Sequence, residues 1–386
     1  MTEATRLTWA DVRARRLERH ALLERAPRGR LVDVVRDVCG IHAQVMSAAE
    51  VSIGTRVWVK REDVAAALWT ERTLVKAYGV RGTVHLLSSD ELPLWVASHK
   101  ASGRRGNEED RLAALGLDQR KVDMVVDAIA QALDGRRLTL RALEDEVVRR
   151  AGSWGRERRV SAFGGAWPVW RVGLGYAARA GLLCFGPNEG TQVTYALPHQ
   201  WLRGWREIDT PVALAEVFRR FVRTYGPATY RDFAQWFAIN PGIARDVANA
   251  LGGELVTVDV EGYRCLALAA DVSEGAPALN GSVRLLPHFD CYLRGFHPRS
   301  ALVGEFAARS AGGTGQAPVV LVDGTVAGVW ERHAAAGKRL EVRVDPFVPL
   351  RPDQRRELEA EAARLGEFLG LEPTLAIGAV TVRAHL

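Results

Sequence analysis

LTLRALEDEV at residues 138–147 and ATYRDFAQWF at residues 228–237 decide the fold, because these two distant stretches begin a helix in the same way. Each places a threonine, Thr139 or Thr229, at the N-cap, where the hydroxyl accepts a hydrogen bond from an amide of the first turn. Helical patterns flank both stretches, and two short strand-like runs follow each. Three helices followed by a β-hairpin are typical of the winged helix, a relative of the helix-turn-helix.

This pattern of three helices and a hairpin occurs three times, over roughly residues 8–90, 118–199 and 210–268. The expected helices lie at residues 8–19, 30–39, from 61 onward, 119–133, 140–150, 168–180, 211–225, 230–238 and 241–251. The expected strands lie at residues 74–80, 83–87, 182–185, 192–197, 254–258 and 264–268. Because the third helix of a winged helix fits the major groove, the repeats indicate contact with double-stranded DNA. The alternative is that the modules mediate protein–protein contacts.

After about residue 276 the pattern changes to a β-rich one. Strand-like runs lie at residues 282–296, 318–333 and 339–350, and one helix at 352–369 precedes a last strand at 374–383. This part is expected to form a barrel-like β domain with one helix. We therefore predict an α+β fold with three winged-helix modules and a C-terminal β domain, with boundaries at residues 1–100, 101–205, 206–275 and 276–386.

The composition is that of an ordinary globular protein with a basic excess. The 386 residues carry a net charge of +6, and the basic residues comprise 47 arginines and five lysines. Codon bias in a GC-rich genome explains this excess; the functional alternative is an anion-binding surface, since arginine suits phosphate. No signal peptide or long apolar run is present, and the four cysteines form no CxxC pair, so we expect a cytoplasmic, nucleoid-associated protein.

Three further stretches carry a family resemblance: GIHAQ at residues 40–44, YGVRGTVHLL at residues 78–87, and LLPHFDCYLRGFHPR at residues 285–299 with VDGTVAGVW at residues 322–330. Together they resemble the AlkZ-like (YcaQ/AlkX) family of bacterial winged-helix DNA glycosylases, over nearly the whole chain. The resemblance implies a monofunctional glycosylase that releases N7- or N3-alkylated purines. Bulky natural-product adducts are among the implied substrates, so a role in self-resistance to a genotoxic natural product follows as an expectation.

The family places a Q-x-Q or Q-x-D motif where this chain has His42-Ala43-Gln44. Gln44 matches the second position and His42 departs from the commonest first residue, so the resemblance implies that these two residues are catalytic. An N7-alkylated guanine is cationic and leaves without protonation, and the sugar passes through an oxocarbenium-like state. A group that orients water is then sufficient. Glutamine offers its carbonyl oxygen, and a neutral histidine can also accept the proton of the water.

The spacing of His42 and Gln44 makes a structural demand. Residues two apart on an α-helix point in different directions, so the pair cannot act together within a helix. Gly40 can end the helix in a left-handed conformation, and we therefore predict that residues 41–45 are non-helical, with the two side chains on one face. If the helix continued instead, His42 would extend its apolar stripe and be a core residue.

Two basic segments are candidates for DNA contact. Arg81 lies at the first hairpin turn, where it either contacts phosphate or is simply solvated. Residues 288–299 mix aromatic and basic side chains in a way that suits insertion into the minor groove. The DNA-binding residues expected there are His288, Tyr292, Arg294, His297 and Arg299.

Other residues near these segments have different expected roles. Phe289 and Leu293 are expected in the core, and Asp290 is expected to fix the hairpin or to orient a basic neighbour. The arginine clusters at Arg104-Arg105 and at residues 156–159 either contact phosphates or form a solvated face. No aromatic cage surrounds His42, although Trp58 and Trp69 could approach, so we expect the enzyme to act on the sugar from the groove with little base flipping.

The remaining patterns favour no other chemistry. The chain lacks a GxSxG elbow, a phosphate-binding GxxxxGK[ST] loop and any cluster spaced for a metal, so no metal and no cofactor are expected. The expected partner is double-stranded DNA with alkylated purines, bound by a monomer and without a membrane. The alternative function is a non-catalytic winged-helix transcriptional regulator, although three unequal modules suit a clamp on one lesion better than a palindromic operator.

Overall fold

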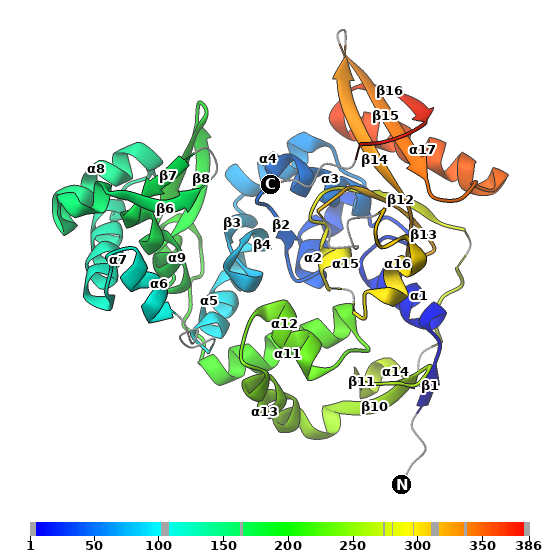
Figure 1. The fold of residues 1–386 in the computed structure, drawn as a ribbon, viewed down its shortest axis with the longest axis horizontal. Coiled ribbons are helices and arrows are strands. Elements are labelled where there is room, and N and C mark those ends of the chain that lie inside the picture. Colours follow the sequence, from blue (N-terminus) through cyan, green and yellow to red (C-terminus); the bar gives the residue numbers. More distant parts are fainter. Residues whose placement is uncertain are drawn as a thin grey trace. The chain divides into compact units, whose positions relative to one another are not determined.

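The computed structural model describes residues 5–101, 108–162, 165–272, 275–279, 281–295, 297–309, 316–335 and 338–381. The fold is α+β, and the chain separates into two compact units (Figure 1). The split unit comprises Met1–Ala66 and Phe218–Leu386, and the central unit comprises Ala67–Val217. The proposed division into four domains stays a prediction. Within the described residues, we find no helix with the length and apolar character that crossing a membrane requires.

The N-terminal part of the split unit contains two expected helices and one that was not expected. Helix α1 (Trp9–Arg19) begins at a capping box in which Thr8 and Asp11 exchange hydrogen bonds, and α2 (Leu31–Asp37) follows. Helix α3 (Met46–Arg56) was missed because every residue from Ala48 to Arg56 is buried, which leaves no polar face to create a helical period. Helix α4 (Arg61–Trp69) then carries the chain into the central unit.

The third predicted repeat is present as helices α11 (Thr210–Tyr225), α12 (Tyr230–Phe237) and α13 (Pro241–Leu251), followed by strands β10 (Leu255–Val260) and β11 (Tyr263–Leu268). Thr229 caps α12 with a complete capping box, as its sequence pattern predicts. The hairpin is antiparallel, and a strand that was not predicted, β1 (Thr5–Leu7), pairs with β10 in parallel. A short helix α14 (Ala269–Val272) closes this part.

The C-terminal part is an open sheet with one long helix on it. Its strands, in spatial order, are β12 (Val283–Leu286), β13 (Val319–Val322), β14 (Thr325–Ala335), β15 (Arg339–Pro346) and β16 (Glu372–Ile377). Neighbours are antiparallel except for the parallel pair β15 and β16. No pairing joins β12 to β16 in the part of the chain that the structure describes, so the expected barrel is a curled half-barrel.

Helix α17 (Pro352–Leu369) packs against β12, β16 and α3. Gly54 of α3 permits this close approach, because a Cβ atom there would lie 2.6 Å from the Phe368 ring. The segment expected to continue as strand after β12 is helical instead, as α15 (Cys291–Gly295) and α16 (Ser300–Val303). The physical reason is Asp290, whose carboxylate accepts a hydrogen bond from the Tyr292 amide at 3.0 Å and so starts a helical turn.

The central unit contains helices α5 (Leu92–Lys100), α6 (Glu108–Ala114), α7 (Gln119–Leu133), α8 (Leu140–Ala151), α9 (Val172–Arg179) and α10 (Pro198–Trp201). Its strands are β3 (Leu74–Tyr78), β4 (Val84–Ser88), β5 (Leu138–Thr139), β6 (Arg158–Ala162), β7 (Gly165–Pro168), β8 (Cys184–Glu189) and β9 (Gln192–Ala196). The hairpins β3–β4 and β8–β9 were predicted, and they pack together through stacked rings of Tyr78 and Phe185, 5.8 Å apart.

The hairpin β6–β7 was not predicted. Pro168 ends β7 opposite Arg158, so the helix expected from residue 168 begins only at Val172, after a 3-10 turn. The arginine cluster at residues 156–159 therefore runs into a strand rather than lying in a loop. The other cluster, Arg104-Arg105, lies outside the described residues.

Candidate active site

The His42–Gln44 segment leaves its helix as predicted. Helix α2 ends at Asp37, and both Cys39 (φ 61°) and Gly40 (φ 91°) adopt left-handed conformations. The Gly40 amide donates to the Val35 carbonyl at 2.9 Å, which closes the helix end. Residues 41–45 are non-helical: β2 (Ile41–His42) is followed by a bend that leads into α3. The non-helical backbone predicted for residues 41–45 is therefore confirmed, and the shared face of His42 and Gln44 stays a prediction.

The side chains of this segment divide between the interior and the surface. Ile41 and Ala43 are fully buried, whereas Gln44 is exposed to solvent. His42 is buried as well, with 7% of its surface exposed, and its ring centroid is 4.9 Å from that of Phe289. Gln44 is therefore free to meet a large substrate, while a neighbouring aromatic ring holds the imidazole in a defined orientation.

Phe289 links the motif to the distant basic segment. It was expected in the core, but it is only half-buried and adopts a left-handed backbone conformation (φ 61°) in the turn between β12 and α15. One side of its ring faces His42, and the guanidinium carbon of Arg294 lies 5.2 Å from the ring centroid. The turn conformation thus places an aromatic side chain beside the predicted catalytic histidine, 247 positions earlier in the chain.

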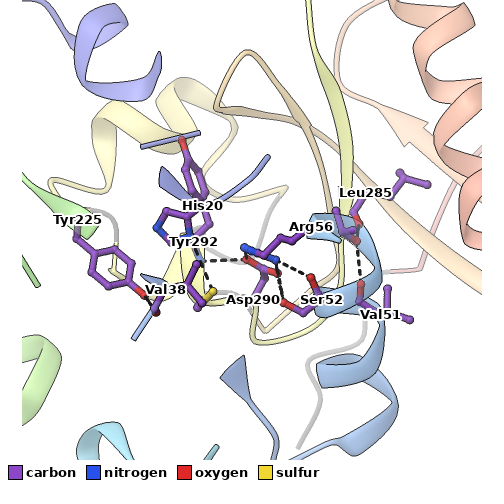
Figure 2. A network of polar contacts seen from close by, with 11 residues as sticks. His20, Val38, Val51, Ser52, Arg56, Tyr225, Leu285, Asp290 and Tyr292 are labelled. Carbon is purple, nitrogen blue, oxygen red and sulfur yellow. Dashed lines mark hydrogen bonds and ion pairs between the residues drawn. The ribbon is translucent and has the colours of Figure 1, made fainter. Parts of the chain in front are cut away.

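A buried ion pair anchors this turn to α3 (Figure 2). Asp290 and Arg56 form two hydrogen bonds, of 2.7 and 2.8 Å, and neither side chain is exposed. Ser52, one turn earlier on α3, donates to the same carboxylate at 2.7 Å and accepts from Arg56 at 2.9 Å. Asp290 was expected to fix a hairpin or to orient a basic neighbour; it does hold a basic side chain, but that side chain comes from α3 and not from its own segment. Its partner Arg56 was missed.

The electrostatics of the pair favour the charged form of Arg56. Burial alone would lower the pKa of Arg56, but the Asp290 carboxylate more than compensates and raises it above its ordinary value. A carboxylate that accepts from a guanidinium, a hydroxyl and a backbone amide has most of its lone pairs satisfied. Together these contacts hold the turn that carries Phe289 against α3.

An uncharged histidine lies behind the ion pair. His20 is completely buried between Tyr225 and Tyr292, whose ring centroids are 5.1 and 5.2 Å away in edge-on contacts (Figure 2). Burial, reinforced by nearby arginines such as Arg56, holds its pKa well below the ordinary value. The hydroxyl groups of the tyrosines donate to backbone carbonyls at 3.0 and 3.1 Å. This layer is structural support for the site.

Tyr292 is therefore a correction to the predicted DNA contacts. Only 1% of its surface is exposed, and its hydroxyl is engaged by the Gly324 carbonyl, so it cannot reach a groove. The expectation failed because aromatic side chains suit a core and a DNA interface equally well. Leu293 is fully buried, as predicted.

The remaining predicted contacts lie in two places. His288, Arg294, His297 and Arg299 are half-buried around α15 in the split unit. His288 shares a 2.6 Å hydrogen bond with the Gln316 carbonyl, and Arg299 donates to the Leu293 carbonyl at 2.5 Å. Arg81 belongs to the central unit, in a 3-10 turn with φ 59° between β3 and β4, and is also half-buried.

A cavity of about 540 Å³ opens beside the motif within the split unit. It begins at Val45, the residue after Gln44, and includes His288, the residue before Phe289. Its lining residues are Val45, Ser47, Ala48, Pro287, His288, Ala317, Pro318, Val329, Trp330, Glu331, Arg332, His333, Val380 and Thr381. Trp58, which was expected to approach the motif, instead follows the far end of α3.

A family model described as DNA glycosylase AlkZ-like matches residues 35–368. The chain belongs to the AlkZ-like DNA glycosylase family. The match begins within α2 and ends within α17, so it includes His42, Gln44, Arg56 and Asp290. Membership of the AlkZ-like family makes this protein an enzyme of DNA repair, a hydrolase of the DNA glycosylase class, with DNA as its partner.

Both the sequence comparison and the structure comparison find an AlkZ-like relative from Streptomyces sahachiroi. One, an interstrand DNA cross-link repair glycosylase, is 32% identical over 380 residues, covering 94% of this chain and 97% of the relative. The solved structure of the DNA glycosylase AlkZ from that organism is similar with a TM-score of 0.79 and 29% identity, covering 97% of this chain and 100% of the other.

Proposed function

We propose that this protein hydrolyses the N-glycosidic bond of bulky N7-alkylguanine or N3-alkyladenine adducts in duplex DNA, as a monofunctional and monomeric glycosylase, with His42 and Gln44 as its catalytic residues. The observation that carries the proposal is the bend at residues 41–45, which presents Gln44 to solvent next to an oriented His42 and a large cavity. The chain displays this arrangement within a family of DNA glycosylases.

The chemistry asks little of the protein beyond positioning. The alkylated base is already cationic and departs with the bonding electrons, which leaves positive charge on the sugar. The carbonyl oxygen of Gln44 orients a water molecule and faces the developing charge, while a neutral His42 accepts the proton of that water as it attacks C1′. The products are a free alkylated base and an abasic site.

DNA contact is assigned to the repeated helix and hairpin units, acting as three winged helices, and to basic side chains in each unit. Arginine and histidine donors are suited to phosphate oxygens. In the split unit these are His288, Arg294, His297 and Arg299, which surround the turn that carries Phe289. In the central unit Arg81 occupies the hairpin turn. The sugar is approached from the groove, and little base flipping is needed.

The biological role that suits this activity is removal of lesions made by a genotoxic natural product of the same cell, on nucleoid DNA in the cytoplasm. The related interstrand DNA cross-link repair glycosylase supports extending the substrates to large lesions. Self-resistance predicts that cells lacking the protein become sensitive to the compound but grow normally without it.

The direct test is incubation of purified protein with a duplex that contains one N7-alkylguanine, followed by heat or alkali to cleave abasic sites. We expect strand breaks at the adduct with the wild type and none with His42→Ala or Gln44→Ala, although both variants still bind the duplex. His199→Ala and Gln131→Ala, which alter exposed residues of the central unit, serve as matched controls with normal activity. A stable complex with one undamaged sequence and no cleavage would support the transcriptional regulator instead.

A further inference from the structure

The cavity beside Gln44 has the size and lining of a site for a small organic ligand. Its volume of about 540 Å³ falls within the range of roughly 300–1,000 Å³ that is typical of such sites. Apolar lining comes from α3 through Ala48, and from the neighbouring strands β13 and β14 through Pro318, directly before β13, and Val329. Such walls favour a group with a large apolar surface, since burying that surface is the main source of affinity.

The polar groups of the cavity favour an acceptor on that ligand. Arg332 on β14 is half-buried, and its Nη1 atom is buried without a hydrogen-bond partner among the described residues. Burial, together with the nearby Arg61 guanidinium, lowers the pKa of Arg332, and the Glu50 carboxylate offsets only part of this shift. A buried donor without a partner is costly, so a ligand oxygen that accepts from Arg332 would relieve the cost. The Glu331 carboxylate of the lining lies 3.4 Å from His333.

The position of the cavity relates it to the reaction. Val45 lies in its wall and directly follows Gln44, and His288 lies in its wall and directly precedes Phe289, the ring against His42. A sugar held at His42 and Gln44 therefore has the cavity next to it. An alkyl group bonded to the purine can enter this space while the purine itself stays outside.

We propose that this cavity binds the non-nucleobase part of a bulky adduct, a largely apolar group of drug-like size that bears an oxygen acceptor for Arg332. This inference rests on the proposed glycosylase function and names the part of the substrate that the protein recognises. It explains how a large lesion is accommodated without a pocket for a flipped base. A flipped purine in the cavity is the competing occupant that the test must separate.

The test uses two duplexes that differ in the size of the alkyl group, one with N7-methylguanine and one with an aflatoxin–N7-guanine adduct, which is planar, apolar and rich in carbonyl oxygens. Ser47→Trp blocks the cavity from an exposed position at the start of α3, and Arg332→Met removes the guanidinium at similar length. Glu359→Trp, on the exposed face of α17, is the matched control.

For Ser47→Trp and Arg332→Met we expect kcat/KM on the aflatoxin adduct to fall by roughly 10-fold or more, the worth of one charge-assisted hydrogen bond or of the blocked contact surface. The same variants should excise N7-methylguanine within about 2-fold of the wild-type rate. Equal losses on both duplexes would place the base itself in the cavity, and no loss on either would leave the cavity outside recognition. Both results overturn the inference.

Binding separates this inference from the proposed function. In a Gln44→Ala background that leaves the duplexes intact, Ser47→Trp should weaken the affinity for the aflatoxin duplex alone. If the wild type bound that duplex selectively, lost the selectivity with Ser47→Trp and yet released no base, the proposed catalysis would fail while the cavity assignment survived. Equal affinity of the wild type for both duplexes would contradict the cavity assignment.

Discussion

In the split unit Arg56 and Asp290 form an ion pair from which water is excluded, whereas in the central unit Arg156 and Asp145 form one with both side chains more than half exposed. The split unit contains a second buried cluster of this kind, in which Glu361 of α17 forms ion pairs with both Arg25 and Arg284. The central unit contains a second ion pair with an exposed arginine, between Arg149 and Glu146 on α8.

This difference assigns different tasks to Arg56 and Arg156. A buried pair contributes little net stability. It nevertheless favours one packing geometry over alternatives, because breaking the pair leaves a buried charge without its partner. The split unit thus fixes the turn at Phe289 beside His42. An exposed pair is weak and readily exchanged, so Arg156 remains available to phosphates.

Breaking the buried pair should have the largest effect on stability. Arg56→Met leaves the Asp290 carboxylate buried without its main partner, and we expect the free energy of unfolding to fall by about 3–5 kcal/mol. Urea unfolding followed by tryptophan fluorescence measures it. The double variant Arg56→Met, Asp290→Leu removes both charges and should lose less than the single variant. A single variant within about 1 kcal/mol of wild type would mean that the pair behaves like a surface pair.

The buried His99 of the central unit tests whether burial of a charged group also affects stability there. Burial lowers the pKa of His99 in α5 to about 4, so the folded form stays neutral while the unfolded chain takes up a proton below pH 6.5. The associated stability is complete above pH 6.5 and is lost as pH falls toward 4, by about 3 kcal/mol in total. His99→Gln should remove this part of the acid sensitivity. Identical pH profiles of unfolding for variant and wild type, between pH 7 and 4, would contradict the burial.

A pair of glycines compares packing in the two units. Gly54→Ala pushes a methyl group to within 2.6 Å of the buried Phe368 ring, and we expect a loss of about 1–3 kcal/mol. Gly175→Ala, inside α9 of the central unit, meets no atom within 4 Å and should stabilise by about 0.5–1 kcal/mol. Thermal unfolding of both variants checks the signs. A neutral Gly54→Ala would show that α3 and α17 can separate at little cost.

The exposed pair should give the smallest change in stability. Arg156→Ala is expected to alter the free energy of unfolding by less than about 1 kcal/mol. If its guanidinium contacts phosphate, the slope of log K against log salt for DNA binding should decrease by about one. Binding titrations at several salt concentrations measure this slope. An unchanged slope would remove Arg156 from the DNA-binding surface without affecting the assignment of the site.

Local signals predicted much of the fold. Thr139 and Thr229 predicted the starts of α8 and α12, and Gly40 predicted the bend that carries the motif. These signals depend on residues that are close in the sequence, so they can be recognised from the sequence alone. The bend in particular followed from the demand that residues two apart share a face.

Long-range contacts were not predictable. Arg56 and Asp290 are 234 positions apart, and nothing near either residue indicates that the other is its partner. Helix α3 was not predicted, because burial on all sides removes the polar face that creates a helical pattern of apolar residues. Tyr292 was misassigned because its ring is chemically suited to DNA, and only the packing against His20 and Gly324 reveals its place in the core.

The most direct test of the account is single-turnover release of an N7-alkylguanine from duplex DNA by His42→Ala, Gln44→Ala and the double variant, with enzyme in excess. Each single change should slow base release by roughly 10²–10⁴-fold at unchanged DNA affinity. The double variant should be little slower than the slower single one, because the two residues act on one water molecule. Base release by the double variant at the wild-type rate would show that the bend at residues 41–45 does not carry the chemistry.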